Sequence, residues 1–165
     1  MTSIPIFSFV AYSGTGKTTL LTKLIGELKS RGLRVAVIKH DAHEFDIDHE
    51  GKDSWHFTRA GSDVTVVVSG TKAAIMENRP VPIETILNKI TDVDIIITEG
   101  YKHGVWPKIA VRREATGNPF PIPAEDCIAV VSDVPECSQT PCFGLEDISG
   151  IADFIIKLCN PQIDT

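Results

Sequence analysis

The chain has 165 residues, of which 42% are hydrophobic and 23% charged, a composition typical of a globular protein with a full core. A formal net charge of −6 argues against a nucleic-acid partner, because nucleic acids are bound by basic surfaces. No apolar run approaches the ~20 residues of a membrane-spanning helix, and the N-terminus carries no recognisable secretion signal. We therefore expect one domain over residues 1–165, without membrane association and located in the cytoplasm.

Predicted strands and helices alternate along the chain, which is the pattern of an α/β protein. The segments 64–68 and 72–77 are expected to pair antiparallel, because their connection is too short for a crossover. The sequence thus predicts an α/β, P-loop NTPase-like, three-layer fold, with a mostly parallel central sheet and helices on both faces. The expected strands are 4–10, 33–39, 64–68, 72–77, 94–100, 108–112 and 127–131, and the expected helices are 17–31, 54–60, 82–91 and 149–158.

The segment 11–19, Ala-Tyr-Ser-Gly-Thr-Gly-Lys-Thr-Thr, lies between the first strand and the first helix. Glycines in such a loop adopt positive φ, so that backbone N–H groups and the helix N-terminus surround an anion. A lysine and a hydroxyl then reach the phosphates and a magnesium ion. One departure is Ala11, where the usual pattern has glycine. The expected phosphate-binding residues are Ser13, Gly14, Thr15, Gly16, Lys17, Thr18 and Thr19.

Two further strand ends carry candidate nucleotide ligands. Glu99 ends the apolar strand 94–100, and with Thr18 it is the expected magnesium site. Ser132 and Asp133 follow the strand 127–131, where a carboxylate can accept two N–H groups of guanine that adenine does not offer. The Asn-Lys-x-Asp tetrapeptide of common GTPases is absent, and the alternative for Asp133 is an ordinary turn residue.

The polar, histidine-rich segment 40–52 follows the strand 33–39 at the sheet edge where ligands bind. One interpretation is a switch-like loop beginning at Lys39, His40 and Asp41 that responds to the nucleotide. A second is a transition-metal site containing His40, His43 and His49, and a third is a solvated loop. Basic residues near the strand 108–112 could bind an anionic second substrate or partner, or form a solvated edge: Lys102, Lys108, Arg112 and Arg113.

Six motifs follow one another along the chain: 12–21, 37–40, 51–54, 59–61, 99–103 and 129–135. Taken in this order, they resemble the MobB family, the adapter proteins of molybdopterin-guanine dinucleotide biosynthesis. The resemblance implies a GTP-binding protein, at most a weak GTP hydrolase, that acts with a guanylyltransferase joining GMP to molybdopterin. It also implies a homodimer with strands exchanged or paired between subunits, with GTP phosphates at Ser13 to Thr19 and magnesium at Thr18. Direct contact with molybdopterin is left open.

Two other functions remain as alternatives. A small-molecule P-loop kinase would need an acceptor pocket and a positioned carboxylate, which Asp41 or Asp48 could supply. A metallochaperone-type GTPase is suggested by the histidines of the segment 40–52. Preference for ATP with fast phosphoryl transfer would favour the kinase, and stoichiometric binding of nickel or zinc would favour the chaperone.

Overall fold

The structure, a computed structural model, describes residues 4–41, 45–134 and 140–159. These residues form two compact units. The smaller unit lies within 41–90, and the larger unit contains 4–40 and the chain from 91 onward. The expectation of one domain over 1–165 stays a prediction. The phosphate loop and the candidate magnesium ligands all lie in the larger unit.

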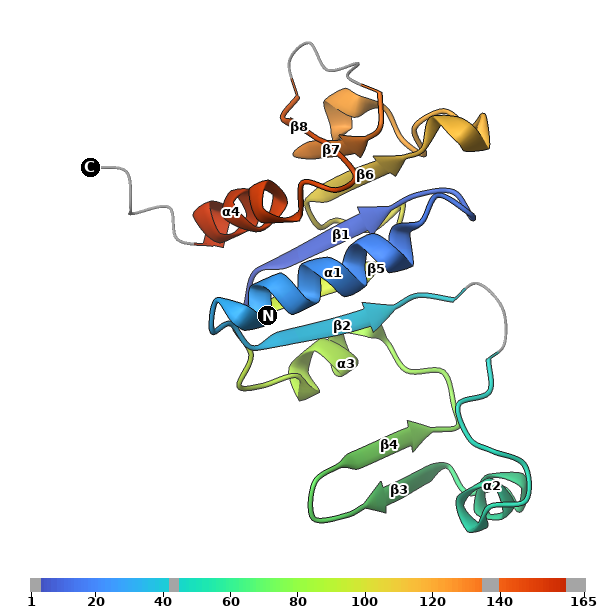
Figure 1. The fold of residues 1–165 in the computed structure, drawn as a ribbon. Helices are drawn as coiled ribbons and strands as arrows, with labels where there is room; N and C mark the ends of the chain where they lie inside the picture. The colour runs from blue at the N-terminus through green and yellow to red at the C-terminus, as the bar shows by residue number, and fades with distance from the viewer. Residues whose placement is uncertain (1–3, 42–44, 135–139, 160–165) are drawn as a thin grey trace. The chain divides into compact units, whose positions relative to one another are not determined.

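The larger unit is built on a six-stranded sheet with the strand order β2-β5-β1-β6-β7-β8 (Figure 1). Every neighbouring pair in this sheet is parallel, which confirms the predicted P-loop NTPase-like α/β fold. β8 was not predicted, because two residues are too few to show an alternating pattern. The strands are β1 (Ile6–Val10), β2 (Val35–Lys39), β5 (Ile95–Glu99), β6 (Lys108–Arg112), β7 (Ala129–Ser132) and β8 (Cys142–Phe143).

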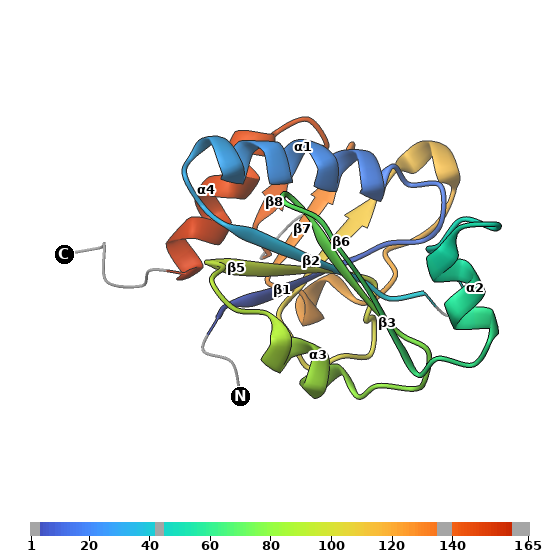
Figure 2. The same ribbon diagram turned by 90° about the horizontal axis from the view of Figure 1, so that it is seen from below.

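Alternate residues of a strand point to opposite faces of the sheet. In β1, residues of both faces are buried in apolar clusters. Phe7 and Phe9 of β1 belong to the main core, which also contains residues of α1 (Lys17–Ser30) and α4 (Ile148–Cys159). Both helices lie over the same face of the sheet (Figure 2). Val10 belongs to a second apolar cluster with Phe120 and Ile122, from the segment between β6 and β7. That segment contains two short 3-10 helices: η1 (Glu114–Thr116) and η2 (Ala124–Asp126).

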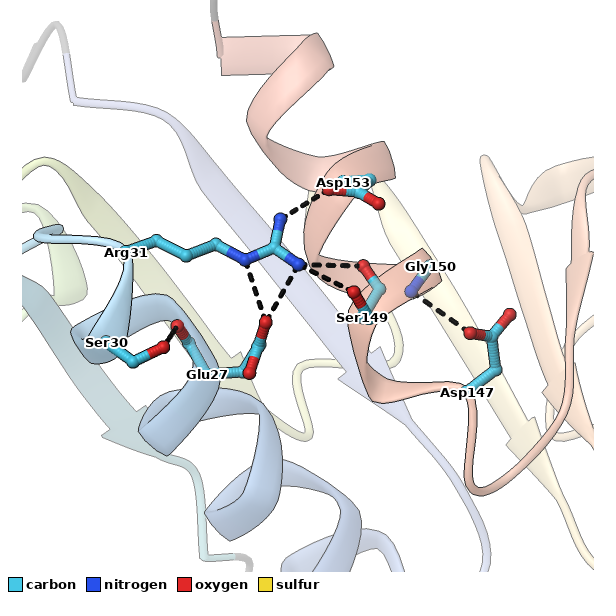
Figure 3. Close-up of polar contacts among 7 residues, drawn as sticks. All are labelled: Glu27, Ser30, Arg31, Asp147, Ser149, Gly150 and Asp153. Carbon is cyan, nitrogen blue, oxygen red and sulfur yellow. Dashed lines mark hydrogen bonds and ion pairs between the residues drawn. The ribbon is translucent and has the colours of Figure 1, made fainter.

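A polar contact at the end of α1 joins this helix to α4 (Figure 3). Arg31 Nε donates to Glu27 Oε1 at 2.9 Å, one helical turn earlier. Its guanidinium also pairs with Asp153 of α4 and donates to Ser149 Oγ at 2.8 Å. The contacts with Asp153 and Glu27 raise the pKa of Arg31 above its ordinary value. One side chain therefore links the C-terminal end of α1 to α4, and both helices contribute residues to the main core.

The smaller unit contains a two-stranded antiparallel hairpin of β3 (Val64–Val68) and β4 (Ala73–Glu77), as predicted. It also contains α2 (Asp53–Arg59) and α3 (Ile83–Lys89). Helix α2 was expected over 54–60 and begins one residue earlier, at Asp53, with no side-chain hydrogen bond at its N-cap. Within residues 4–41, 45–134 and 140–159, no helix has the length and apolar content needed to cross a bilayer.

Candidate phosphate-binding site

The loop between β1 and α1 has the backbone geometry predicted from its glycines. Gly14 and Gly16 adopt φ of 79° and 84°, in the region that side-chain-bearing residues rarely enter. Between them Thr15 is buried, and its hydroxyl donates to the carbonyl of Tyr12 at 3.1 Å. Gly16 is the N-cap of α1 and provides no side-chain cap, so the first N–H groups of the helix are available to an external anion.

Lys17, the first residue of α1, is paired with Glu99 at the end of β5. Lys17 Nζ lies 3.6 Å from Glu99 Oε1, and the two side chains are only 16% and 17% exposed. The parallel pairing explains this meeting, because Glu99 stands in register with Phe9 just before the loop. The N–H of Gly100 donates to the carbonyl of Phe9 at 3.0 Å and continues that register. Lys17 was expected to contact phosphate and Glu99 to hold magnesium, and these two residues, 82 positions apart in the chain, lie side by side.

Asp94 begins this stretch at the other end of β5 and takes no part in the site. Its carboxylate accepts hydrogen bonds from the backbone and guanidinium of Arg34. These bonds hold the pKa of Asp94 below its ordinary value. The chain therefore places one acid of the strand at the phosphate loop and uses the other as a structural ion pair.

Arg113 is a member of the site that the sequence did not identify as such. It follows β6, which pairs with β1 on the side opposite β5. Its Nε donates to the carbonyl of Thr15 at 3.1 Å. A Cβ on Gly16 would lie 3.2 Å from Arg113 Nη2, so the guanidinium packs closely against the loop backbone. The sequence indicated only a basic residue at a strand end, because it does not show which strand adjoins β1.

The predicted guanine-binding residues both have hydrogen-bond partners within the protein. Asp133 Oδ1 accepts the backbone N–H of Glu114 at 2.8 Å. Ser132 is buried, and its hydroxyl accepts the N–H of Val134 at 3.1 Å. Asp133 therefore joins the end of β7 to the segment that begins at Arg113. Recognition of guanine by these two residues stays a prediction.

The start of the predicted switch-like loop adjoins Glu99 through β2. Lys39 is in register with Glu99, and the N–H of His40 donates to the carbonyl of Glu99 at 2.9 Å. The His40 ring lies 4.6 Å from that of Tyr101, which stands at a positive φ of 54° after Gly100. Asp41 belongs to the smaller unit. The backbone of His40 is thus held by a hydrogen bond to Glu99, the last residue of β5.

The predicted transition-metal site is only partly covered by the structure. His43 lies outside the described residues, whereas His40 and His49 lie within them. In the described part of the chain, no group of three or more histidine, cysteine or acidic residues could hold a metal ion. Burial raises the pKa of the Cys127 thiol to about 11, so this side chain is a neutral core residue.

The hard oxygen donors near the loop suit a different ion. Thr18 is exposed at the start of α1, and Glu99 supplies a carboxylate at the end of β5. Hydroxyl and carboxylate oxygens are the ligands that Mg²⁺ accepts, usually together with phosphate oxygens and water. Two protein ligands are too few to hold the ion alone. The residues present therefore fit a magnesium ion that arrives with a nucleotide and is also bound by its phosphate oxygens.

Known proteins are similar to this chain over most of its length. The family model described as molybdopterin guanine dinucleotide synthesis protein B matches residues 6–133. The molybdopterin-guanine dinucleotide biosynthesis adapter protein of Escherichia coli (strain K12) is 38% identical, covering 98% of this chain and 97% of the relative. That of Haemophilus influenzae is 38% identical, covering 92% and 88%. A crystal structure of molybdopterin-guanine biosynthesis protein B superposes with a TM-score of 0.71 at 30% identity, covering 93% of this chain and 99% of that one. The chain therefore belongs to the family of molybdopterin guanine dinucleotide synthesis protein B.

Proposed function

We propose that this chain is a GTP-binding adapter protein that assists a guanylyltransferase in attaching GMP to molybdopterin. The observation that carries the proposal is the loop from Gly14 to Lys17, with two left-handed glycines, an uncapped helix N-terminus and a half-buried ammonium group. Such a loop suits a polyphosphate, because amides, helix dipole and lysine all favour negative charge at one place. Family membership supports the biosynthetic pathway, since the relatives are adapter proteins of molybdopterin-guanine dinucleotide biosynthesis.

In this proposal magnesium accompanies the nucleotide and is held by Thr18 and Glu99. The bound ion would neutralise charge on the phosphates. Phosphate contacts extend over Ser13 to Thr19, and Ser132 with Asp133 would favour guanine. We expect hydrolysis to be weak at most, because the sequence shows no obvious general base for a phosphoacceptor.

The same proposal includes a homodimer formed through the hairpin β3–β4. The hairpin leaves large apolar side chains exposed, with Val66 at 58%, Val68 at 74% and Ile75 at 60%. A two-stranded sheet is marginally stable by itself, and an apolar face of this kind is typical of an interaction surface. A second copy that pairs or exchanges strands would cover it. The protein would work in the cytoplasm, with the guanylyltransferase as partner and molybdopterin as a further ligand to be tested.

The test is the binding of a fluorescent GTP analogue to wild type and to Lys17→Ala. The variant should bind much more weakly while its unfolding midpoint stays close to that of wild type, because Lys17 lies in the first turn of α1 and is not part of the apolar core. Lys23→Ala is the matched control, since Lys23 is on the same helix and pairs with exposed Glu146. Unchanged affinity in Lys17→Ala would refute the nucleotide site, and preference for ATP with fast transfer to a small acceptor would favour a kinase instead.

The adapter role needs a separate measurement. Purified guanylyltransferase should be retained by immobilised wild-type protein, and the same experiment with molybdopterin shows if the pterin binds this chain directly. Absence of retention with and without GTP and Mg²⁺ would contradict the adapter role, even if GTP binding itself were demonstrated.

A further inference from the structure

The contact between Arg113 and the phosphate loop has a direction that matters for the amides of the loop. Arg113 Nε donates to the carbonyl of Thr15, at 3.1 Å. That carbonyl belongs to the same peptide group as the N–H of Gly16. The described chain has no cis peptide bond. In a planar trans peptide the C=O and N–H point in opposite directions. The bond that holds the Thr15 carbonyl toward Arg113 therefore turns the Gly16 N–H away from Arg113.

The same hydrogen bond makes the Gly16 N–H a better donor. A cation bound at a peptide carbonyl polarises the whole amide group, and hydrogen bonds through one peptide strengthen each other. Arg113 also restricts the glycine, since its guanidinium occupies the space 3.2 Å from where a Gly16 side chain would begin. A flexible residue at φ of 84° is thus held in one orientation without any contact from the ligand side.

The backbone of Arg113 is itself fixed by its neighbours. Its carbonyl accepts the Thr116 hydroxyl at 2.7 Å, which closes the turn η1. The next residue, Glu114, donates its N–H to Asp133 at 2.8 Å. Arg113 is half-buried, so its side chain has little freedom to leave the loop. A guanidinium on a short, hydrogen-bonded turn is a rigid support for the peptide that it contacts.

We infer that Arg113 is a positioning residue of the nucleotide site, which holds the Thr15–Gly16 peptide so that the Gly16 amide donates to a bound phosphate. This inference rests on the proposed GTP binding and adds a residue from outside the loop motif. Arg113 acts through the loop backbone, so its effect should be on affinity for polyphosphates rather than on folding.

The experiment compares GTP affinity, with Mg²⁺ present, for wild type, Arg113→Ala and Arg113→Lys. Removing a charged donor from one peptide of the site should weaken GTP binding about tenfold in Arg113→Ala. Arg113→Lys keeps the charge but has no donor at the position of Nε, so its affinity should fall between the two. Methylguanidinium in the buffer should restore much of the affinity of Arg113→Ala. Thermal unfolding should show that both variants remain folded.

Arg34→Ala is the matched control. Arg34 is also an arginine next to a strand, but it pairs with Asp94, at the end of β5 far from the loop. This variant should bind GTP like wild type and should not respond to methylguanidinium. Wild-type affinity in Arg113→Ala, or equal affinity of Arg113→Lys and wild type, would overturn the positional role while leaving GTP binding intact. If wild type and Lys17→Ala bind GTP equally poorly, the proposed function fails and the inference falls with it.

Discussion

Replacing Glu99 by glutamine separates two roles that one carboxylate has in the proposed site. In the structure Glu99 pairs with Lys17 at 3.6 Å, and in the nucleotide complex it would help to hold Mg²⁺. Without Mg²⁺ the carboxylate competes with phosphate for the ammonium group, so Glu99→Gln should tighten GTP binding. With Mg²⁺ the same change removes a negative ligand of the ion, so it should weaken binding. The sign of the effect should therefore reverse between the two buffers.

The distance sets the size of the first effect. Two unit charges at 3.6 Å attract by about 1.2 kcal/mol in water and by about 4.6 kcal/mol at an effective dielectric constant of 20. Partial exposure and lost side-chain entropy favour the lower value, and ~1 kcal/mol corresponds to about fivefold in Kd. We therefore expect GTP in EDTA to bind Glu99→Gln about fivefold more tightly than wild type.

The assay is titration of a fluorescent GTP analogue in EDTA and in millimolar Mg²⁺. Asp153→Asn is the control, because it also removes the acid partner of a basic residue, but at the C-terminal end of α1, opposite the loop. Its affinity should be that of wild type in both buffers. If Glu99→Gln changed affinity in the same direction with and without Mg²⁺, the assignment of both roles to one carboxylate would be wrong.

Three further predictions concern other parts of the molecule. Asp133→Asn keeps an oxygen that can accept the backbone N–H of Glu114, so it should lower the GTP-over-ATP affinity ratio without changing the unfolding midpoint. Asp133→Ala should lower the affinity ratio and the unfolding midpoint. An unchanged affinity ratio in Asp133→Asn would show that Asp133 only holds the backbone of Glu114. Val68→Lys should convert a hairpin-mediated dimer to monomer in sedimentation equilibrium, while Val105→Lys, at a residue 93% exposed in the larger unit, should not. Hydrogen bonds from Arg34 lower the pKa of Asp94, so the carboxylate stabilises the fold above its unfolded-state pKa of about 3.9 and this contribution is lost as pH falls through the lower folded value. Urea unfolding should accordingly show Asp94→Asn less stable than wild type at pH 7, with the difference shrinking in acid.

Local patterns were sufficient for the loop and for most of the elements. The glycines, the lysine and the surrounding strand and helix predicted the geometry found at Gly14 and Gly16. The position of Glu99 could be predicted as well. In a parallel sheet, the carboxyl end of a strand next to β1 lies beside the loop that follows β1, and Glu99 is at that end of β5. The hairpin followed from the shortness of its connection.

The contacts that could not be predicted depend on the order of strands, which the sequence does not state. Arg113 meets the loop only because β6 adjoins β1, and the N–H of Glu114 meets Asp133 only because β7 adjoins β6. An aspartate at a strand end looks the same when it binds a base and when it holds a neighbouring turn. The start of a helix is also hard to predict from sequence: α2 begins at Asp53, one residue before the expected position.

Beneath the loop, two hydroxyl groups are buried against each other. Ser8 Oγ and Thr98 Oγ1 lie 2.7 Å apart on the adjacent strands β1 and β5, and both residues are fully inaccessible. Removing one hydroxyl would leave the other buried without this hydrogen bond and lower the free energy of unfolding by about 1–3 kcal/mol. Replacing both with apolar groups of the same shape should be close to neutral. These two positions should therefore change together or not at all as the lineage diverges, and a library that randomises them singly should recover mainly the parental pair.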